Sequence, residues 1–196
     1  MLLDRDGVLI RDVDLLTDPR DVQLLTGVPA ALVRLRLAGF ALILVTNQTV
    51  VARGLATLDD VRRVNAAMMQ QIIDAGGPQL DGVYVCPHHP HADLPEYRVA
   101  CDCRKPRPGL LRAAATERGL DLAASFVVGD RMTDVAAGAA VGAHTVLVHS
   151  GRHRDAPIVM VDDLPADLRP DHECAGLEEA AAWIAAARGR HSAVRA

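Results

Sequence analysis

The sequence predicts a single α/β domain, a Rossmann-like three-layer sandwich in which helices cover both faces of a central parallel sheet. Three observations support this fold class. Apolar runs alternate with helical patterns, polar residues gather where the runs end, and 196 residues suffice for one core but are short for two. The run Phe40–Val45 is continuously apolar, as expected of a strand buried on both faces. We therefore assign residues 1–187 to one domain and residues 188–196 to a C-terminal tail.

Glycine and proline mark the ends of most predicted helices. Gly39 and the pair Gly76-Gly77 follow the first two helices, and Pro108 opens the third. The predicted helices are Val28–Ala38, Leu58–Ala75, Pro108–Arg118, Thr133–Ala140 and Leu177–Ala187. The predicted strands are Met1–Leu3, Phe40–Val45, Gly82–Val85, Ser125–Val128 and His144–Val148, and a further short strand is expected around Ile158–Val161 in the irregular stretch 151–176. No insertion between these elements is long enough to form a large cap domain.

Composition excludes several functions. The net charge of −4 argues against a nucleic-acid partner, which would need a broad basic surface, and 3% aromatic residues leave few rings for stacking on bases. The longest apolar runs are too short to span a membrane, so no membrane association is expected. The chain reaches Asp4 without a leader-like segment, which indicates a cytoplasmic protein. We expect it to act as a monomer on a small substrate.

Polar residues follow four of the predicted strands. Because the carboxyl ends of parallel strands share one edge of a sheet, these residues should form a common ligand-binding crevice. They are Asp4 and Asp6, Thr46 and Asn47, Arg104 and Lys105, and Asp130 and Asp134. Carboxylates, a hydroxyl, an amide and cations together can bind a metal and a phosphoryl group. Each pair alone would be an ordinary turn or helix cap, and it is their order along one chain that indicates a site.

These residue types fit a phosphatase. Asp4 can attack phosphorus to form an aspartyl phosphate, and Asp6 can protonate the leaving group and later activate water. Mg²⁺ held by Asp4, the backbone carbonyl of Asp6 and Asp130 would offset the crowding of negative charge. Lys105 and the Thr46 hydroxyl would bind the phosphoryl oxygens, where the transition state spreads its charge.

A second metal site is predicted between residues 86 and 103. Cys86, Cys101 and Cys103 supply three thiolates, and three thiolates with one imidazole form a recognised structural zinc site. The candidate imidazoles are His88, His89 and His91. Zn²⁺ would fix a long polar loop that has no core of its own, and it would also set the position of the adjacent Lys105. The alternative is a surface loop with incidental thiols.

The strand-end motifs resemble those of the haloacid dehalogenase (HAD) superfamily of phosphatases. The residues that carry the resemblance are Leu3–Val8, Val45–Gln48, Cys103–Pro106 and Val128–Asp130. The likeness extends from Met1 to about Gly151 and is greatest to the D-glycero-D-manno-heptose 1,7-bisphosphate phosphatases, whose neighbours are the histidinol-phosphate phosphatases. It implies a phosphatase that uses Mg²⁺, acts on a small phosphosugar and carries a zinc-stapled loop.

The resemblance also assigns roles. It makes Asp4 the nucleophile, Asp6 the general acid and base, and Asp130 a magnesium ligand, with Thr46 and Lys105 stabilising the phosphoryl group. It favours His88 as the fourth zinc ligand, because the family has the same Cys-Pro-His-His-Pro run. The expected substrate-binding residues are Asn47, Gln48, Thr49, Arg104 and Arg131.

Two departures from the family pattern bear on the substrate. Val50 replaces a glycine in the loop after the second strand, and residues 11–15 lack the usual Gly-Tyr. The leading interpretation is hydrolysis of the 7-phosphate of heptose 1,7-bisphosphate, in nucleotide-heptose biosynthesis. The alternatives are histidinol phosphate or another small phosphate monoester as substrate, or a regulator that binds sugar phosphates without turnover. The intact pair of carboxylates at Asp4 and Asp6 argues against the last.

Overall fold

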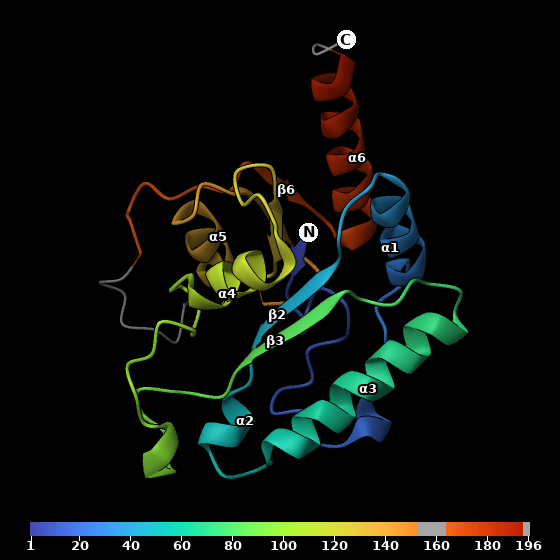
Figure 1. The fold of residues 1–196 in the computed structure, drawn as a ribbon. Helices are drawn as coiled ribbons and strands as arrows, with labels where there is room; N and C mark the ends of the chain where they lie inside the picture. Colours follow the sequence, from blue (N-terminus) through green and yellow to red (C-terminus); the bar gives the residue numbers. More distant parts are fainter. Residues whose placement is uncertain (153–163, 194–196) are drawn as a thin grey trace.

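The computed structural model describes residues 1–152 and 164–193 and contains one parallel six-stranded sheet (Figure 1). The strand order is β3-β2-β1-β4-β5-β6. The strands are β1 (Leu2–Leu3), β2 (Ile43–Asn47), β3 (Gly82–Cys86), β4 (Phe126–Gly129), β5 (His144–Val148) and β6 (His172–Cys174). The chain thus starts in the middle of the sheet, builds outward to β3, and returns to the other side of β1 to add β4.

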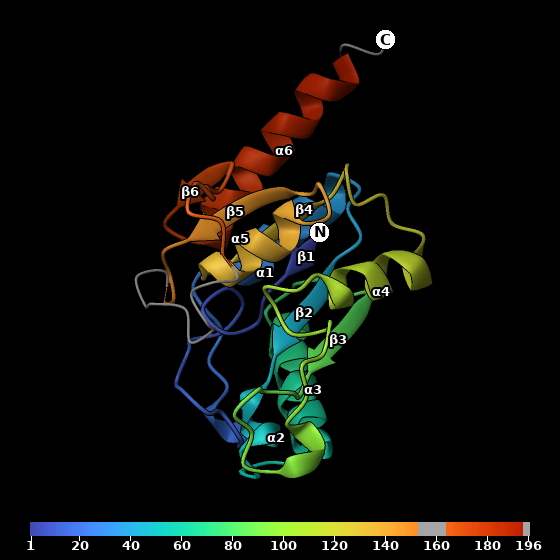
Figure 2. The same ribbon diagram turned by 90° about the vertical axis from the view of Figure 1, so that its left-hand side faces the viewer.

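Helices cover both faces of this sheet (Figure 2). The α-helices are α1 (Val28–Leu37), α2 (Thr49–Ala52), α3 (Leu58–Asp74), α4 (Gly109–Arg118), α5 (Met132–Ala139) and α6 (Leu177–Ala193), and the short 3₁₀ turns are η1 (Pro19–Asp21) and η2 (Pro95–Tyr97). Leu3 packs toward α1, α3 and α6, whereas Leu2 packs toward α4 and α5. Because successive strand side chains point to opposite faces, two adjacent leucines join two separate halves of the core.

Local sequence explains where the longer helices begin and end. Thr57 and Asp60 form a reciprocal capping box at the start of α3. Gly119, in the left-handed conformation, ends α4. Two ion pairs, Arg62–Asp59 and Arg63–Asp60, lie along the first turns of α3.

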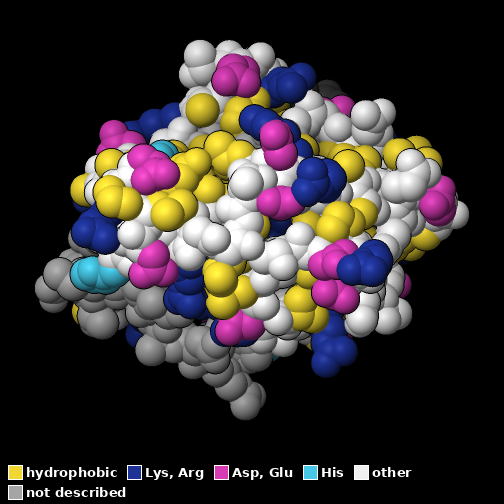
Figure 3. Space-filling view, turned by 90° about the horizontal axis from the view of Figure 1, so that it is seen from below, with side chains coloured by type: hydrophobic (Ala, Val, Ile, Leu, Met, Phe, Trp, Pro, Cys, Tyr) yellow, Lys and Arg dark blue, Asp and Glu magenta, His cyan; other side chains and the backbone are white. Residues whose placement is uncertain are grey.

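Figure 3 shows the molecule from below relative to the view of Figure 1. On this side of the molecule, basic and acidic side chains are interspersed among hydrophobic ones.

The pairing of the strands determines where the catalytic edge of the sheet lies. Leu3 of β1 lies beside Leu44 of β2 on one side and beside Val128 of β4 on the other. The strand order reverses at β1, and ligands of open α/β sheets bind at such a reversal beyond the carboxyl ends of the strands. The backbone N–H of Asp4 donates to the Val128 carbonyl (3.0 Å), so the first catalytic candidate leaves the sheet at this point.

The predicted fold class is confirmed, with several differences in detail. Strand β2 starts at Ile43 instead of Phe40, since pairing begins where Ile43 N–H meets the Met1 carbonyl, and it continues through Asn47. Strand β6 (His172–Cys174) was not predicted because its three residues contain no apolar run. Helix α6 extends to Ala193, so residues 188–193, expected to be a tail, are helical. The strand expected around residues 158–161 lies outside the described residues.

Within the described ranges, no insertion between strands forms a separate cap domain. In the same residues, no helix has the length and apolar character needed to cross a membrane.

Candidate active site

The four strand-end motifs converge on one cleft of about 160 Å³. Asp4 and Asp6 enter it from β1, Asn47 and Gln48 from the end of β2, and Asp130 from the end of β4. The remaining charged lining consists of two acidic residues, Asp12 and Asp14, and six basic ones: Arg5, Arg53, Arg104, Lys105, Arg131 and Arg152. The cleft therefore combines a cluster of carboxylates with a cationic wall, as a site for a metal and a phosphate ester requires.

Lys105 lies at the centre of the charge cluster and is 3% exposed. Its Nζ is 3.0 Å from Asp4 Oδ2 and 2.5 Å from Asp134 Oδ1, and it donates to the Val45 carbonyl at 2.9 Å. Burial would lower the pKa of Lys105, but Asp134 and Asp4 outweigh burial and raise that pKa. The ammonium group thus has one hydrogen-bond acceptor and two ion-pair partners. A phosphoryl oxygen would replace one of them.

Asp4, Asp130 and Asp134 form a compact carboxylate group. One oxygen from each lies within 4.8 Å of the others. Burial first, and then the charges of Asp4 and Asp134, raise the pKa of Asp130 to about 7. Burial also raises the pKa of Asp134 to about 6, with Asp4 adding to the rise and Lys105 opposing it. The raised pKa values mean that too little positive charge surrounds these carboxylates to keep them ionised. A hard divalent cation would supply that charge.

The orientation of Asp130 depends on two glycines. Its Oδ2 accepts a hydrogen bond from the Arg152 backbone N–H (2.6 Å). A Cβ on Gly7 would lie 2.5 Å from this oxygen, and a Cβ on Gly151 would lie 2.2 Å from it. Gly7 also has φ +74°, a conformation that side chains disfavour. The backbone thus closes around the outer side of Asp130.

Asp6 is held away from this carboxylate group. Its side chain accepts hydrogen bonds from Arg5, at 3.1–3.2 Å, and from Gln48 Nε2, at 2.9 Å. Gln48 Nε2 also donates to Thr46 Oγ1 at 2.9 Å. Burial and then Asp4 raise the pKa of Asp6, while Arg5 and Gln48 oppose the rise. A magnesium contact from Asp6 therefore stays a prediction that rests on its backbone carbonyl, because the side chain has other partners.

Several expected substrate contacts have structural roles in the free protein. The Asn47 side chain pairs with the Lys105 backbone, donating to its carbonyl (3.1 Å) and accepting from its N–H (3.2 Å). The amide of Gln48 is likewise occupied by Asp6, Thr46 and Arg5. Thr46 is 1% exposed and does not line the cleft, although its hydroxyl hydrogen is still available to donate.

Thr49, Arg104 and Arg131 line the cleft as the sequence predicts. Arg104 Nη1 donates to Thr49 Oγ1 (3.2 Å) and to the His88 carbonyl (3.0 Å), while its buried Nε has no hydrogen-bond partner. Arg131 Nη2 lies 3.7 Å from Asp12 Oδ2, an acceptor that also pairs with Arg152 Nε at 2.8 Å. Arg104 thus has an unused donor in a cleft suited to an anion.

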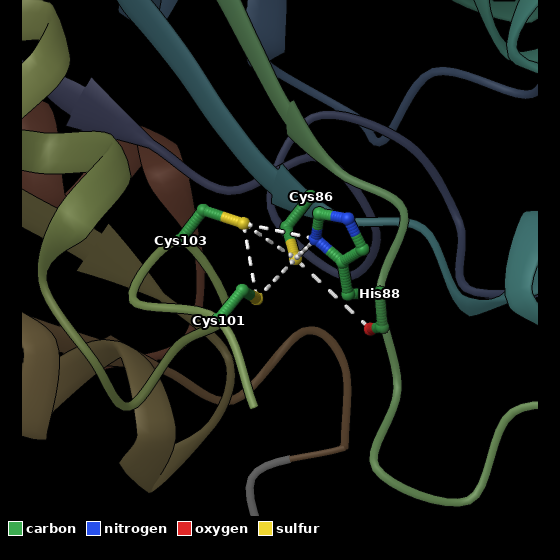
Figure 4. Close-up of side chains that lie close together, drawn as sticks. All are labelled: Cys86, His88, Cys101 and Cys103. Carbon is green, nitrogen blue, oxygen red and sulfur yellow. Dashed lines mark hydrogen bonds between the residues drawn. The ribbon is translucent and has the colours of Figure 1, made fainter. Parts of the chain in front are cut away.

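The four predicted zinc ligands lie together (Figure 4). His88 Nδ1 is 3.2 Å from Cys103 Sγ and 3.8 Å from Cys86 Sγ. The sulfur–sulfur distances are 3.1–3.7 Å, too long for a disulfide and close to the edges of a tetrahedron around a single ion. His89 accepts from the His91 backbone N–H instead and lines the cleft, so of the three candidate imidazoles only His88 joins the thiols.

Burial and mutual contact alter the pKa values of the three thiols. Burial, followed by the neighbouring thiols, raises the pKa of Cys86, and burial raises that of Cys103 to about 11. The pKa of Cys101 is lowered, because hydrogen bonds from Cys103 and the Arg104 backbone outweigh its burial. Ion binding would have to release the remaining thiol protons. The donor set of three sulfurs and one imidazole fits Zn²⁺.

Curated relatives share this sequence over most of its length. A D-glycero-beta-D-manno-heptose-1,7-bisphosphate 7-phosphatase of Photorhabdus laumondii is 40% identical over 153 residues, which cover 78% of this chain and 81% of the relative. The enzymes of the same name from Yersinia pestis and Escherichia coli K12 are each 39% identical, over 85% and 78% of this chain and 87% and 80% of their own. The chain belongs to this family. A HAD-hydrolase-like family model also matches residues 102–180.

The similarity to solved structures of heptose bisphosphatases extends over nearly the whole chain. The D,D-heptose 1,7-bisphosphate phosphatase of B. bronchiseptica, complexed with magnesium and phosphate, has a TM-score of 0.77 and 33% identity, and the match covers 94% of this chain and 96% of that one. A HAD-like phosphatase of Mesorhizobium loti has the same TM-score at 27% identity, over 95% of this chain and 84% of its own. The family and superfamily predicted from the motifs are therefore confirmed.

Three residues of this heptose bisphosphatase site were missed as functional candidates from sequence. Arg5 looked like a surface residue of a turn, yet it is 1% exposed. Asn65 was one polar residue of a helix, and it bonds to Arg5 across 60 residues of sequence. Asp134 was noted at a strand end but given no role, and it pairs with Lys105. Only Asp134 had a sequence signal, since it follows Asp130 by four residues beside the same strand end.

Proposed function

We propose that the protein hydrolyses the 7-phosphate of D-glycero-D-manno-heptose 1,7-bisphosphate by way of a phosphoryl group carried on Asp4. The observation that carries the proposal is the position of Asp4 in the cleft. Its carboxylate lies 3.0 Å from Lys105 and within the carboxylate group of Asp130 and Asp134. The family to which the chain belongs supports the substrate. We expect the β anomer, which the names of these relatives specify.

The residues divide the reaction between them. An Asp4 oxygen attacks phosphorus while the bond from phosphorus to the C7 oxygen breaks, and Asp6 gives its proton to that oxygen. The Asp6 carboxylate then takes a proton from water as the water oxygen attacks the phosphorus on Asp4. The bond between phosphorus and the Asp4 oxygen breaks, which releases inorganic phosphate and restores the Asp4 carboxylate. Lys105 neutralises charge on the phosphoryl oxygens, and the Thr46 hydroxyl can donate to one of them.

Mg²⁺ fits the group of Asp4, Asp130 and Asp134. Two buried carboxylates with raised pKa values lie with the half-buried Asp4 within 4.8 Å and have too little positive charge around them, and Mg²⁺ prefers oxygen ligands. When bound, it would supply charge neutralisation for the attacking carboxylate and the phosphoryl oxygens. The magnesium and phosphate in the B. bronchiseptica enzyme support this assignment.

Zn²⁺ is proposed for Cys86, His88, Cys101 and Cys103, with a structural role. An ion held by all four residues would have no open position for chemistry. The loop that it closes passes directly into Arg104 and Lys105, so the ion would hold the phosphate-binding end of that loop. The monomeric state and the cytoplasmic location stay predictions of the sequence.

Phosphate release from a substrate panel tests this function. The panel contains both anomers of heptose 1,7-bisphosphate, histidinol phosphate and fructose 1,6-bisphosphate, each with magnesium. We expect the β-heptose substrate to have the highest kcat/KM and Asp4→Asn to lower it by about 10⁴-fold or more without loss of fold. A higher kcat/KM for histidinol phosphate would replace the proposed substrate, and an active Asp4→Asn variant would refute the mechanism.

A further inference from the structure

The side chain of Arg5 is the most thoroughly buried charged group in the described residues that the reaction does not use directly. It is 1% exposed, although it lies between two aspartates in a turn. A buried guanidinium is tolerated only when its donors are paired, and removing one partner of such a group is costly. The partners of Arg5 therefore indicate what the residue is for.

Arg5 contacts three separate elements. Its Nε and Nη2 donate to both oxygens of Asp6, at 3.1–3.2 Å. Nη2 also donates to Gln48 Oε1 at 2.7 Å, and Nη1 donates to Asn65 Oδ1 at 3.0 Å. Asn65 is a buried residue of α3, a helix packed on the sheet through Val64, Met68 and Ile72. The guanidinium thus joins the turn after β1 to a rigid helix.

Gln48 closes the arrangement from the other side. It accepts from Arg5 and donates to Asp6 Oδ2 at 2.9 Å, so Asp6 is contacted by two side chains that also contact each other. A planar guanidinium with two bonds to a carboxylate fixes its plane as well as its position. General acid catalysis depends on such geometry, because the acid must reach the leaving oxygen at hydrogen-bond distance.

We propose that Arg5 and Asn65 are positioning residues that hold the Asp6 carboxylate in place for proton transfer, with α3 as the support. The described part of the chain contains no cap domain that could close over the substrate and orient Asp6. The Arg5–Asn65 pair provides this orientation permanently, before substrate binds. This inference rests on the proposed function, in which Asp6 gives its proton to the leaving alkoxide.

The leaving group distinguishes positioning from general structural support. An alkyl phosphate such as the heptose substrate needs a proton on the departing oxygen, whereas 4-nitrophenyl phosphate has a stable leaving group and needs little protonation. The test compares kcat/KM for both substrates, because this quantity reports the phosphoryl transfer to Asp4 and excludes later hydrolysis. We expect Asn65→Ala to lower kcat/KM by about tenfold for the heptose substrate and by less than about threefold for the aryl phosphate.

Two further results belong to the same prediction. Because the hydrolysis of the phosphorylated Asp4 also needs Asp6, Asn65→Ala should give a burst of nitrophenolate followed by slow turnover. In an Asp6→Asn background, Asn65→Ala should cause no additional loss for the heptose substrate. Arg5→Lys keeps the charge but loses the two-pronged contact, so it should reproduce the Asn65→Ala pattern and serves as the test where Asn65→Ala fails to fold.

Gln71→Ala is the matched control. Gln71 also lies on α3 and donates from its side-chain amide, to the Val22 carbonyl at 3.0 Å, but it is not part of the cleft. Gln71→Ala should leave kcat/KM unchanged for both substrates. Equal losses for the alkyl and aryl substrates, no loss for either, or an additive loss in the Asp6→Asn background would overturn the inference. Failure of the wild-type protein to hydrolyse any alkyl phosphate would instead refute the proposed function.

Discussion

The catalytic edge of the sheet and the loop of residues 86–103 lie side by side but are stabilised differently. Asp4, Asp130 and Lys105 are placed by strand ends and buried partners. Of residues 87–102, by contrast, only Pro87, His89 and Ala92 are buried, so the loop has almost no core. Sheet topology positions the first region, and in our proposal Zn²⁺ would position the second. Lys105 follows the last proposed ligand and would then depend on both.

The largest effect should come from crowding the catalytic edge. Gly7→Ala would put a Cβ 2.5 Å from Asp130 Oδ2, so Asp130 or the turn must move. We expect kcat/KM to fall by about 100-fold, since a displacement of about 1 Å at a catalytic group has this cost. Steady-state phosphate release measures the loss, and magnesium titration should show weaker binding.

Gly119→Ala is the control for backbone strain. Gly119 has a similar φ of +63° at the end of α4, but a Cβ there would have nothing within 4 Å. It should lower the free energy of unfolding by about 1–2 kcal/mol and leave kcat/KM unchanged. If Gly7→Ala behaved like Gly119→Ala, the close backbone packing around Asp130 would have no catalytic importance.

An intermediate effect is expected from the loop. Cys103→Ser removes one proposed zinc ligand next to Arg104 and Lys105, so it should lower zinc content, melting temperature and kcat together, with kcat falling about tenfold. Elemental analysis, circular dichroism and phosphate release measure the three. Cys174→Ser is the matched control, because that thiol is buried against the Gly176 carbonyl and outside the zinc cluster. Loss of zinc with full activity would show that Lys105 does not depend on the loop.

The smallest effect is a pH dependence of stability in the metal-free protein. The pKa values of Asp130 and Asp134 are raised to about 7 and about 6, so the folded protein holds more protons than the unfolded chain above the ordinary carboxyl pKa of about 4. The contribution of these two carboxyls to stability therefore falls as pH rises from 5 to 8. The buried Met1 ammonium, whose pKa is lowered to about 5 by burial, contributes a rise over the same range. Lys105 is protonated in both states in this range and does not contribute.

We expect the melting temperature of the wild type to fall by a few degrees from pH 5 to pH 8 relative to that of Asp130→Asn, because the coupled carboxylates share protons. Saturating magnesium should reverse the trend, since the ion binds the ionised group, and Asp130→Asn should flatten it. Calorimetry at several pH values measures both. The same pH dependence of the melting temperature in the wild type and in Asp130→Asn without metal would contradict the proposed charge crowding.

The sequence predicted the parts of the molecule that depend on local order. Apolar runs and the polar pairs that follow them gave the parallel sheet and the edge where Asp4, Lys105 and Asp130 meet. The spacing of Cys86, Cys101 and Cys103 likewise indicated a shared site. These signals can be read from the sequence alone, because each strand is followed by its own site residue and the strand ends meet at a common edge of the sheet.

What the sequence did not predict depends on contacts between distant residues. Arg5 looks exposed until Asn65 and Gln48 are brought to it, and the hydrogen bonds of the Asn47 amide to the Lys105 backbone join residues 58 positions apart. Strand β6 has no apolar run and forms because β5 offers it an edge, with Val148 beside Cys174. In each case the partner comes from tertiary structure, which no local pattern encodes.

In the proposed mechanism, Asp4 carries the phosphoryl group during turnover. Rapid acid quench during hydrolysis of the heptose substrate, followed by borohydride reduction and peptide mass spectrometry, tests it directly, because reduction converts an aspartyl phosphate to homoserine. We expect homoserine at position 4, and none in Asp4→Asn or in protein without substrate. Unmodified Asp4 in a protein that is turning over, with inversion of configuration at phosphorus, would contradict it.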